Sequence, residues 1–167
     1  NVGLWGPVSV GWAERYRSAK VATGSPMLPA GSEHFGGFLA KLDFDQFDRL
    51  YDPTHGWAAH GSYFYAAGDG YDKADLDLRA ADNFGDYIVH GRIRGAGSFT
   101  GSLPFYDPVA LGGFLNLSGF ARNQIVGESL MYGNVRLEKI VGRLPAGLRG
   151  DMRVGLALEG GKVDGRY

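Results

Sequence analysis

The chain has 167 residues, which is enough for one domain, and a formal net charge of −1 from 17 Lys and Arg against 18 Asp and Glu. This balance gives no field that would attract nucleic acid, and the absence of cysteine excludes a disulfide framework or a thiolate metal site. The chain holds 28 glycines, well above the ordinary share of about 7%, and 13% of its residues are aromatic. Such a composition is typical of a β-protein.

Seven stretches alternate between apolar and polar residues with a period of two, which predicts seven β-strands. In chain order they are residues 7–21, 38–47, 56–67, 74–80, 87–94, 134–141 and 152–158. Their apolar positions include Val8, Val10 and Trp12; Phe38, Ala40, Leu42 and Phe44; Trp57, Tyr63 and Tyr65; Leu76 and Leu78; Tyr87, Val89 and Ile93; Val135, Leu137 and Val141; and Met152, Val154, Leu156 and Leu158. The opposite positions carry a dense mixture of charges of both signs.

The connections between these stretches are expected to alternate in length. Tight turns are predicted near Asp52–His55, Asp82–Gly85 and Leu144–Gly150. Longer loops are predicted near Ala22–Glu33, Gly68–Lys73 and Gly101–Gly127. Short turns on one side and long loops on the other are typical of an up-and-down transmembrane barrel.

Two fold classes remain open on this pattern, because a soluble β-sandwich also alternates. The strands are expected to span roughly 10–16 residues, longer than the usual 5–6 of soluble sheets and enough for a tilted bilayer crossing of about 9–11. Several aromatic residues fall toward strand ends, as interfacial girdles require: Trp5, Trp12, Trp57, Tyr65, Tyr87 and Tyr132. The pattern favours an all-β, antiparallel transmembrane barrel. Seven strands do not close a single-chain barrel, so residues 1–167 are expected to form a C-terminal portion of a larger one.

The glycine-rich segment at about 101–126 lies between the fifth and sixth predicted strands. It lacks the GxxxxGK[ST] pattern of a phosphate loop, and Phe114, Leu117 and Phe120 would be costly in a solvated loop. We therefore expect it to pack against another surface. A catalytic Ser118 is a weaker alternative, because no GxSxG elbow surrounds it.

No metal site or cofactor is predicted. His55 and His60 lie five residues apart, a poor spacing for metal ligands on a strand. The acids Asp43, Asp45, Asp75 and Asp77 could line a calcium site, but we expect them to form salt bridges with the basic residues of the same face: Lys41, Arg79, Arg92 and Arg94.

Two stretches, YDPTHGWAAHGSYFY at 51–65 and ALGGFLNLSGFARNQIVGESLMYGNVRLEKI at 110–140, resemble the bacterial surface antigen family. This family includes the barrels of outer-membrane assembly factors, two-partner-secretion pores and patatin-like phospholipases. The matching positions are Asp52 to Gly56, Leu111 to Gly113, Gly119–Phe120, and Arg136 with Glu138. The resemblance covers about residues 35–160 and is strongest over 105–140.

The resemblance implies a sixteen-stranded outer-membrane barrel with a long loop folded into its lumen. The expected loop tip comprises Gly112, Gly113, Leu117, Ser118, Gly119 and Phe120, with Arg136 and Glu138 as its partners on the barrel wall. The family commonly has Arg where this chain has Ser118, and the Ser form looks most like the patatin-like phospholipase branch. Arg122 could replace the missing Arg by reaching Glu138.

The implied role is to anchor, translocate or display an attached domain in the bacterial outer membrane. The lipase dyad of the patatin branch lies in an N-terminal domain that does not correspond to these residues, so the chain is expected to be non-catalytic by itself. Its expected partners are outer-membrane lipid, the rest of the barrel with its periplasmic or catalytic domains, and another copy through strand pairing. The alternative function is a soluble β-sandwich or small barrel that binds carbohydrate or lipid.

Overall fold

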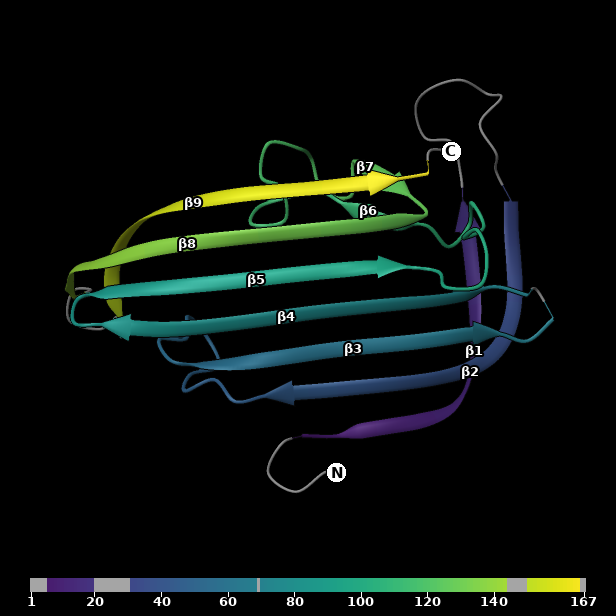
Figure 1. Ribbon diagram of the computed structural model, residues 1–167, viewed down its shortest axis with the longest axis horizontal. Coiled ribbons are helices and arrows are strands. Elements are labelled where there is room, and N and C mark those ends of the chain that lie inside the picture. The colour runs from purple at the N-terminus through teal and green to yellow at the C-terminus, as the bar shows by residue number, and fades with distance from the viewer. Residues whose placement is uncertain (1–5, 20–30, 69, 144–149, 166–167) are drawn as a thin grey trace.

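The computed structural model describes residues 6–19, 31–68, 70–143 and 150–165 and contains nine strands (Figure 1). They are β1 (Val8–Ala19), β2 (Gly31–Asp45), β3 (Gly56–Ala66), β4 (Asp72–Phe84), β5 (Tyr87–Gly97), β6 (Val109–Leu111), β7 (Ile125–Gly127), β8 (Ser129–Arg143) and β9 (Asp151–Asp164). Seven of them form one sheet in the order β1-β2-β3-β4-β5-β8-β9, in which every pairing is antiparallel. The short strands β6 and β7 pair with each other.

The all-β antiparallel fold is confirmed, and each of the seven predicted stretches overlaps a strand of the large sheet. The sequence did not predict β6 and β7, which are too short to show a period. The sheet is open in the described part of the chain: β1 and β9 are its two edges and do not pair with each other. These residues alone therefore do not close into a barrel. No helix in the described ranges is long and apolar enough to cross a membrane.

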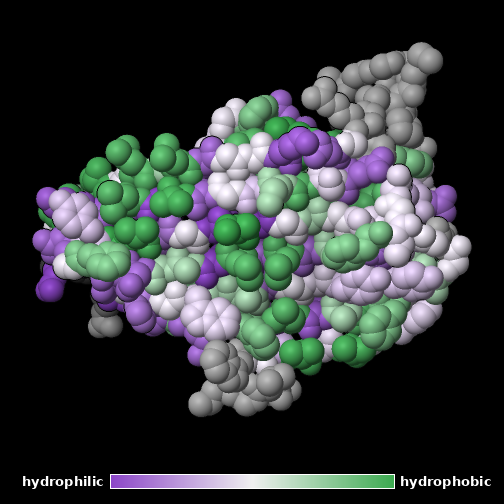
Figure 2. All heavy atoms as spheres, viewed as in Figure 1, coloured by the Kyte–Doolittle hydropathy of each residue, from purple (hydrophilic) through white to green (hydrophobic). Residues whose placement is uncertain are grey.

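The register places most of the apolar and most of the charged side chains on opposite faces of the sheet. Trp12 pairs with Phe38 and Phe38 with Tyr65, so these three aromatic residues form one row across β1, β2 and β3. Farther along the sheet, Leu78 pairs with Ile93 on the same face. We call this side the apolar face, and Figure 2 shows a dense group of its hydrophobic side chains over one end of β8 and β9. The opposite side, the polar face, carries most of the charged residues.

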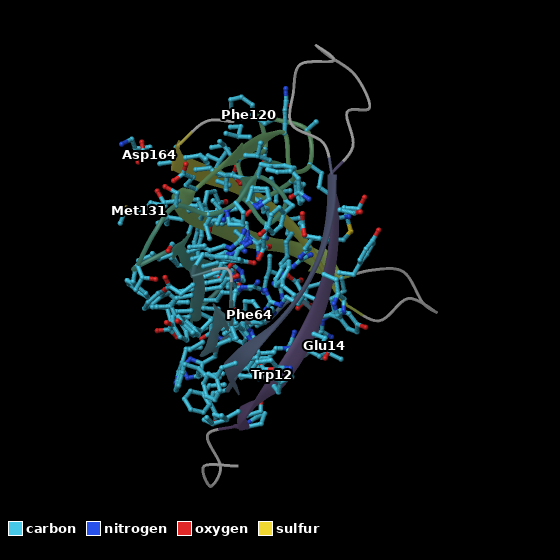
Figure 3. All side chains as sticks on the ribbon, turned by 90° about the vertical axis from the view of Figure 1, so that its right-hand side faces the viewer. Trp12, Glu14, Phe64, Phe120, Met131 and Asp164 are labelled. Atoms are coloured by element: carbon cyan, nitrogen blue, oxygen red, sulfur yellow. The ribbon has the colours of Figure 1, made fainter. Side chains whose placement is uncertain are left out.

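The buried core lies on the polar face, at the end of the sheet where β5 ends and β8 begins. The connection from Ser98 to Glu128, which contains β6 and β7, folds back over this end. Its residues Leu103, Val109 and Leu111 pack against side chains of the sheet and its connections. The members that they meet are Phe35, Phe64, Ala66, Tyr71, Ala96, Leu130 and Tyr132. The long loop predicted at 101–126 thus covers the face that carries the charges, and the sheet curls around it (Figure 3).

The predicted alternation of connection lengths is wrong at two places. The β2–β3 connection is not a tight turn at Asp52–His55, because it spans residues 46–55. The β3–β4 connection spans only residues 67–71, although a longer loop was expected there. A carboxylate explains the first difference: Asp48 accepts hydrogen bonds from the backbone N–H groups of Thr54 (2.8 Å) and His55 (3.0 Å), which stabilises a wide, folded loop. The predicted connections around 22–33 and 144–150 fall largely outside the described residues.

Candidate functional site

The segment from Leu111 to Gln124, which we call the loop tip, is a compact turn structure held by its own backbone. The Gly112 N–H donates to the Asn116 carbonyl (2.9 Å), and the Gly113 N–H donates to the Phe120 carbonyl (3.1 Å). Gly112 has a φ of 127°, and a Cβ at this position would collide with the Ala121 carbonyl oxygen. Glycine is therefore required here by both backbone angle and space. Leu117 has a φ of 77°, which is a strained conformation for a leucine.

Ser118 attaches the loop tip to the sheet through Glu159 of β9. The Ser118 N–H donates to Glu159 Oε2 (2.6 Å), and its hydroxyl donates to Glu159 Oε1 (3.1 Å). The same hydroxyl oxygen accepts a hydrogen bond from the Leu115 N–H (2.9 Å). The Glu159 carboxylate on the sheet thus holds the loop tip through the N–H and the hydroxyl of Ser118. In the family that the sequence resembles, an arginine commonly stands at this position of the tip. The sequence reasoning did not select Glu159, although its place on the charged side of the β9 alternation was a usable signal.

The predicted wall partners Arg136 and Glu138 lie on β8 beside the loop tip without bonding to Ser118. Glu138 forms ion pairs with Arg136 (2.9 Å) and Arg153 (3.3 Å), and His90 Nε2 lies within hydrogen-bond distance of it (3.3 Å). Arg136 and Glu138 line a cavity of about 560 Å³ together with the tip residues Phe114 to Phe120. The structure therefore brings the predicted residues to one cavity, but it assigns the direct contact to Glu159.

The suggested substitute Arg122 is exposed on the loop tip. No ion pair joins it to Glu138 in the part of the chain that the structure describes. Among the other predicted tip residues, Gly119 and Phe120 are exposed, Leu117 is half-buried against the core, and Gly113 is half-buried.

A second attachment of the long connection is Asp107, which is only 2% exposed. Lys73 Nζ donates to Asp107 Oδ1 (2.8 Å) and also to the backbone carbonyls of Asp107 (3.0 Å) and Pro108 (2.8 Å). The Tyr71 hydroxyl donates to Asp107 Oδ2 (3.2 Å), and burial together with this carboxylate raises the pKa of Tyr71 well above its usual range. Arg15 and Arg17 of β1 approach within 3.6 and 3.5 Å. One carboxylate thus ties the connection to both β1 and β4.

The predicted salt bridges among the acids and bases of the polar face are largely present. Arg94 donates to Asp75, and both Arg79 and Arg92 donate to Asp77. Arg92 also donates to the Leu115 carbonyl (3.2 Å), which adds a second attachment of the loop tip to the sheet and a third of the whole connection. Asp43 pairs with His60 of the neighbouring strand. These pairs satisfy the charges that the alternation places on this face.

A further contact joins opposite ends of the sheet across the polar face. Arg153 of β9, whose side chain is 8% exposed, forms an ion pair with Asp52 (2.9 Å) in the β2–β3 connection. Three strands, β4, β5 and β8, separate β9 from β3 in the sheet order, so the β2–β3 connection bridges the open side of the curved sheet. The polar face is therefore covered from two directions, by the loop tip and by the β2–β3 connection.

No segment of the described residues covers the apolar face. Its large side chains are exposed along the whole sheet, from Trp12 at 65% to Leu156 at 82% and Leu158 at 81%. Aromatic residues of this face gather toward the strand ends: Trp12, Tyr16, Phe38, Tyr63 and Tyr65 at the end of the long connection, and Phe44, Trp57, Phe84 and Tyr87 at the other. Tyr132 does not belong to this set, because it is buried in the core on the polar face. Trp5 lies outside the described residues.

Comparison with protein-family models and with curated proteins gives no match to this chain. The resemblance to the surface antigen family therefore rests on the motifs at 51–65 and 110–140.

Proposed function

We propose that the chain is part of a bacterial outer-membrane β-barrel whose apolar face contacts lipid and whose polar face lines the lumen. The observation that supports this proposal is the inverted distribution of polarity. The charged face is covered by the chain's own connections, whereas the hydrophobic face is exposed. Contiguous exposed apolar surfaces larger than a few hundred Å² mark membrane or protein interaction sites.

The dimensions of the sheet support lipid as the partner of this face. The seven long strands contain between 11 and 15 residues, and a tilted strand needs about 9–11 to cross a bilayer. Aliphatic residues such as Leu76, Leu78 and Ile93 lie between the two groups of aromatic residues. Tyr and Trp at both ends of an aliphatic band are the pattern of a membrane barrel.

The open edges of the sheet supply the second part of the proposal. An unpaired edge strand presents a row of free backbone groups that pair with another strand. In the lipid environment such groups must be satisfied, so β1 and β9 would pair with further strands of the parent barrel or with another copy. The chain would then anchor, translocate or display an attached domain. That domain would be a patatin-like phospholipase, and the chain itself would be non-catalytic.

The alternative is a soluble sheet that binds carbohydrate or lipid and shields its apolar face with a second sheet. It requires Leu137, Leu156 and Phe44 to be in a core. Leu137 is 47% exposed and Leu156 is 82% exposed, while Phe44 is half-buried beside Trp57. Within the described residues nothing covers this face, which favours the lipid-facing arrangement.

Purification with and without detergent tests the proposed function. We expect the chain to need detergent or lipid to remain dispersed, to give a β-rich circular dichroism spectrum there, and to migrate differently on gels before and after heating. A monodisperse, water-soluble monomer with no need for detergent or lipid would contradict the proposal.

A further inference from the structure

A second cavity, of about 330 Å³, lies on the polar face between the loop tip and the β2–β3 connection. Phe114 and Leu115 line it from the tip, and Phe47, Leu50 and Pro53 line it from the β2–β3 connection. The walls between these two apolar sides come from charged residues of the sheet. This combination of apolar surfaces with a few polar groups is typical of a site for a small organic ligand.

The charged groups of the cavity differ in how far their hydrogen bonds are satisfied. Arg92 uses Nε and Nη2 on Asp77 and Nη1 on the Leu115 carbonyl, so all three of its nitrogens have acceptors. Arg79 likewise donates to Asp77 through Nε and Nη2. Asp45 is the one carboxylate among the residues that line the cavity.

Arg136 is the exception among these arginines. Its buried Nε faces Glu138 Oε1 at 2.9 Å in an ion pair, and its side chain is 24% exposed. Glu138 is shared with Arg153 and also contacts His90, so this one carboxylate serves two guanidinium groups. A guanidinium offers five N–H donors, more than one shared carboxylate can accept, so Arg136 can offer further donors to an anion in the cavity.

Arg136 can be reached from both cavities that lie beside the loop tip. It lines both the 330 Å³ cavity and the 560 Å³ cavity, as do Phe114 and Leu115. The two cavities therefore flank the loop tip with one arginine below it.

We propose that the cavity beneath the loop tip binds a small organic anion, with its charged group on Arg136 and its apolar body between Phe114 and Leu50. A planar guanidinium matches a carboxylate or phosphate through paired N–H donors. The apolar side chains of the tip and of the β2–β3 connection then cover the rest of the ligand. This inference does not rest on the proposed function, because the cavity lies on the polar face whatever covers the apolar one.

Calorimetric titration of the full chain, in whichever buffer or detergent keeps it folded, tests the proposal with three probes. Phenylphosphate has both the charge and the apolar body, inorganic phosphate lacks the body, and phenol lacks the charge. We expect phenylphosphate to bind about tenfold more tightly than phenol, as one additional charge-assisted interaction predicts. It should also bind more tightly than inorganic phosphate, because its ring is removed from water. Equal binding of phenol and phenylphosphate, or no binding of phenylphosphate, would overturn the proposal.

Variants then assign the two halves of the site. Arg136→Gln should weaken phenylphosphate binding about tenfold, and Arg136→Lys should restore part of it. Arg143→Gln removes an exposed arginine of the same strand and should change nothing. Phe114 is 87% exposed, so Phe114→Ala leaves the fold intact; it should weaken phenylphosphate binding and leave that of inorganic phosphate unchanged. Unchanged phenylphosphate binding in both Arg136→Gln and Phe114→Ala would refute the assignment.

Discussion

Replacing Asp107 with alanine should release the long connection from the sheet while leaving the sheet folded. The substitution removes the acceptor of Lys73 Nζ and of the Tyr71 hydroxyl, and it removes the negative charge that faces Arg15 and Arg17. A hydrogen bond to a charged group contributes about 1.5–3 kcal/mol, and breaking a buried pair costs about 3–5 kcal/mol. Lys73 keeps its bonds to the carbonyls of residue 107 and Pro108, so we expect the lower end, about 3 kcal/mol.

Hydrogen exchange measured by mass spectrometry reads this change locally. A loss of about 3 kcal/mol in the opening free energy corresponds to roughly a hundredfold faster exchange. We expect this acceleration in peptides that cover residues 105–128, with little change in peptides from β3 and β4. Asp164→Ala is the matched control, because the Lys162–Asp164 pair is exposed and should be worth at most about 1 kcal/mol. Unchanged exchange over 105–128 in Asp107→Ala would refute the assignment of Asp107 as the main attachment.

Three further predictions concern the loop tip and its anchors. Gly112→Ala should lower the free energy of opening of the loop tip by about 2 kcal/mol, because the new Cβ collides with the Ala121 carbonyl oxygen. Gly119→Ala should leave this free energy unchanged, because the space around Gly119 is open; hydrogen exchange over residues 112–124 distinguishes the two variants. Ser118→Ala should cost about 1 kcal/mol and Glu159→Ala more, since the alanine at 118 keeps the N–H bond to Glu159; equal effects would contradict this geometry. The raised pKa of Tyr71 means that its stabilisation is complete below about pH 10 and is lost as the pH rises above that value, so alkaline release of 105–128 should be smaller in Tyr71→Phe.

The strands could be predicted because the alternation is long and both faces carry strong signals. Met152, Val154, Leu156 and Leu158 of β9 illustrate this: they lie on the exposed face, and Arg153 lies on the other. The edges of the sheet do not follow from that pattern, since backbone pairing partners leave no mark on side-chain periodicity. Strands β6 and β7 contain three residues each, which is too few to establish a period.

The site could be predicted only as a neighbourhood. Arg136 and Glu138 were expected beside the loop tip and do line its cavity, but the residue that bonds Ser118 is Glu159, one strand farther along the sheet. Sequence places all three on the polar face and cannot rank them, because the choice depends on how the loop folds across neighbouring strands. The width of the β2–β3 connection could not be predicted for a related reason. Asp48 accepts hydrogen bonds from Thr54 and His55, which lie six and seven residues farther along the chain.

The central claim is that the apolar face of the sheet contacts lipid, and adjacent positions on β9 test it most directly. Single cysteines at Leu156 and Ala157 point to opposite faces, and both positions are exposed. After fluorescent labelling and reconstitution in vesicles, lipids that carry a quencher in their acyl chains should quench the label at 156 strongly and the label at 157 weakly. A water-soluble quencher should give the reverse order. Equal quenching at the two positions by the lipid-borne quencher, or protection of position 156 from both quenchers, would contradict the claim.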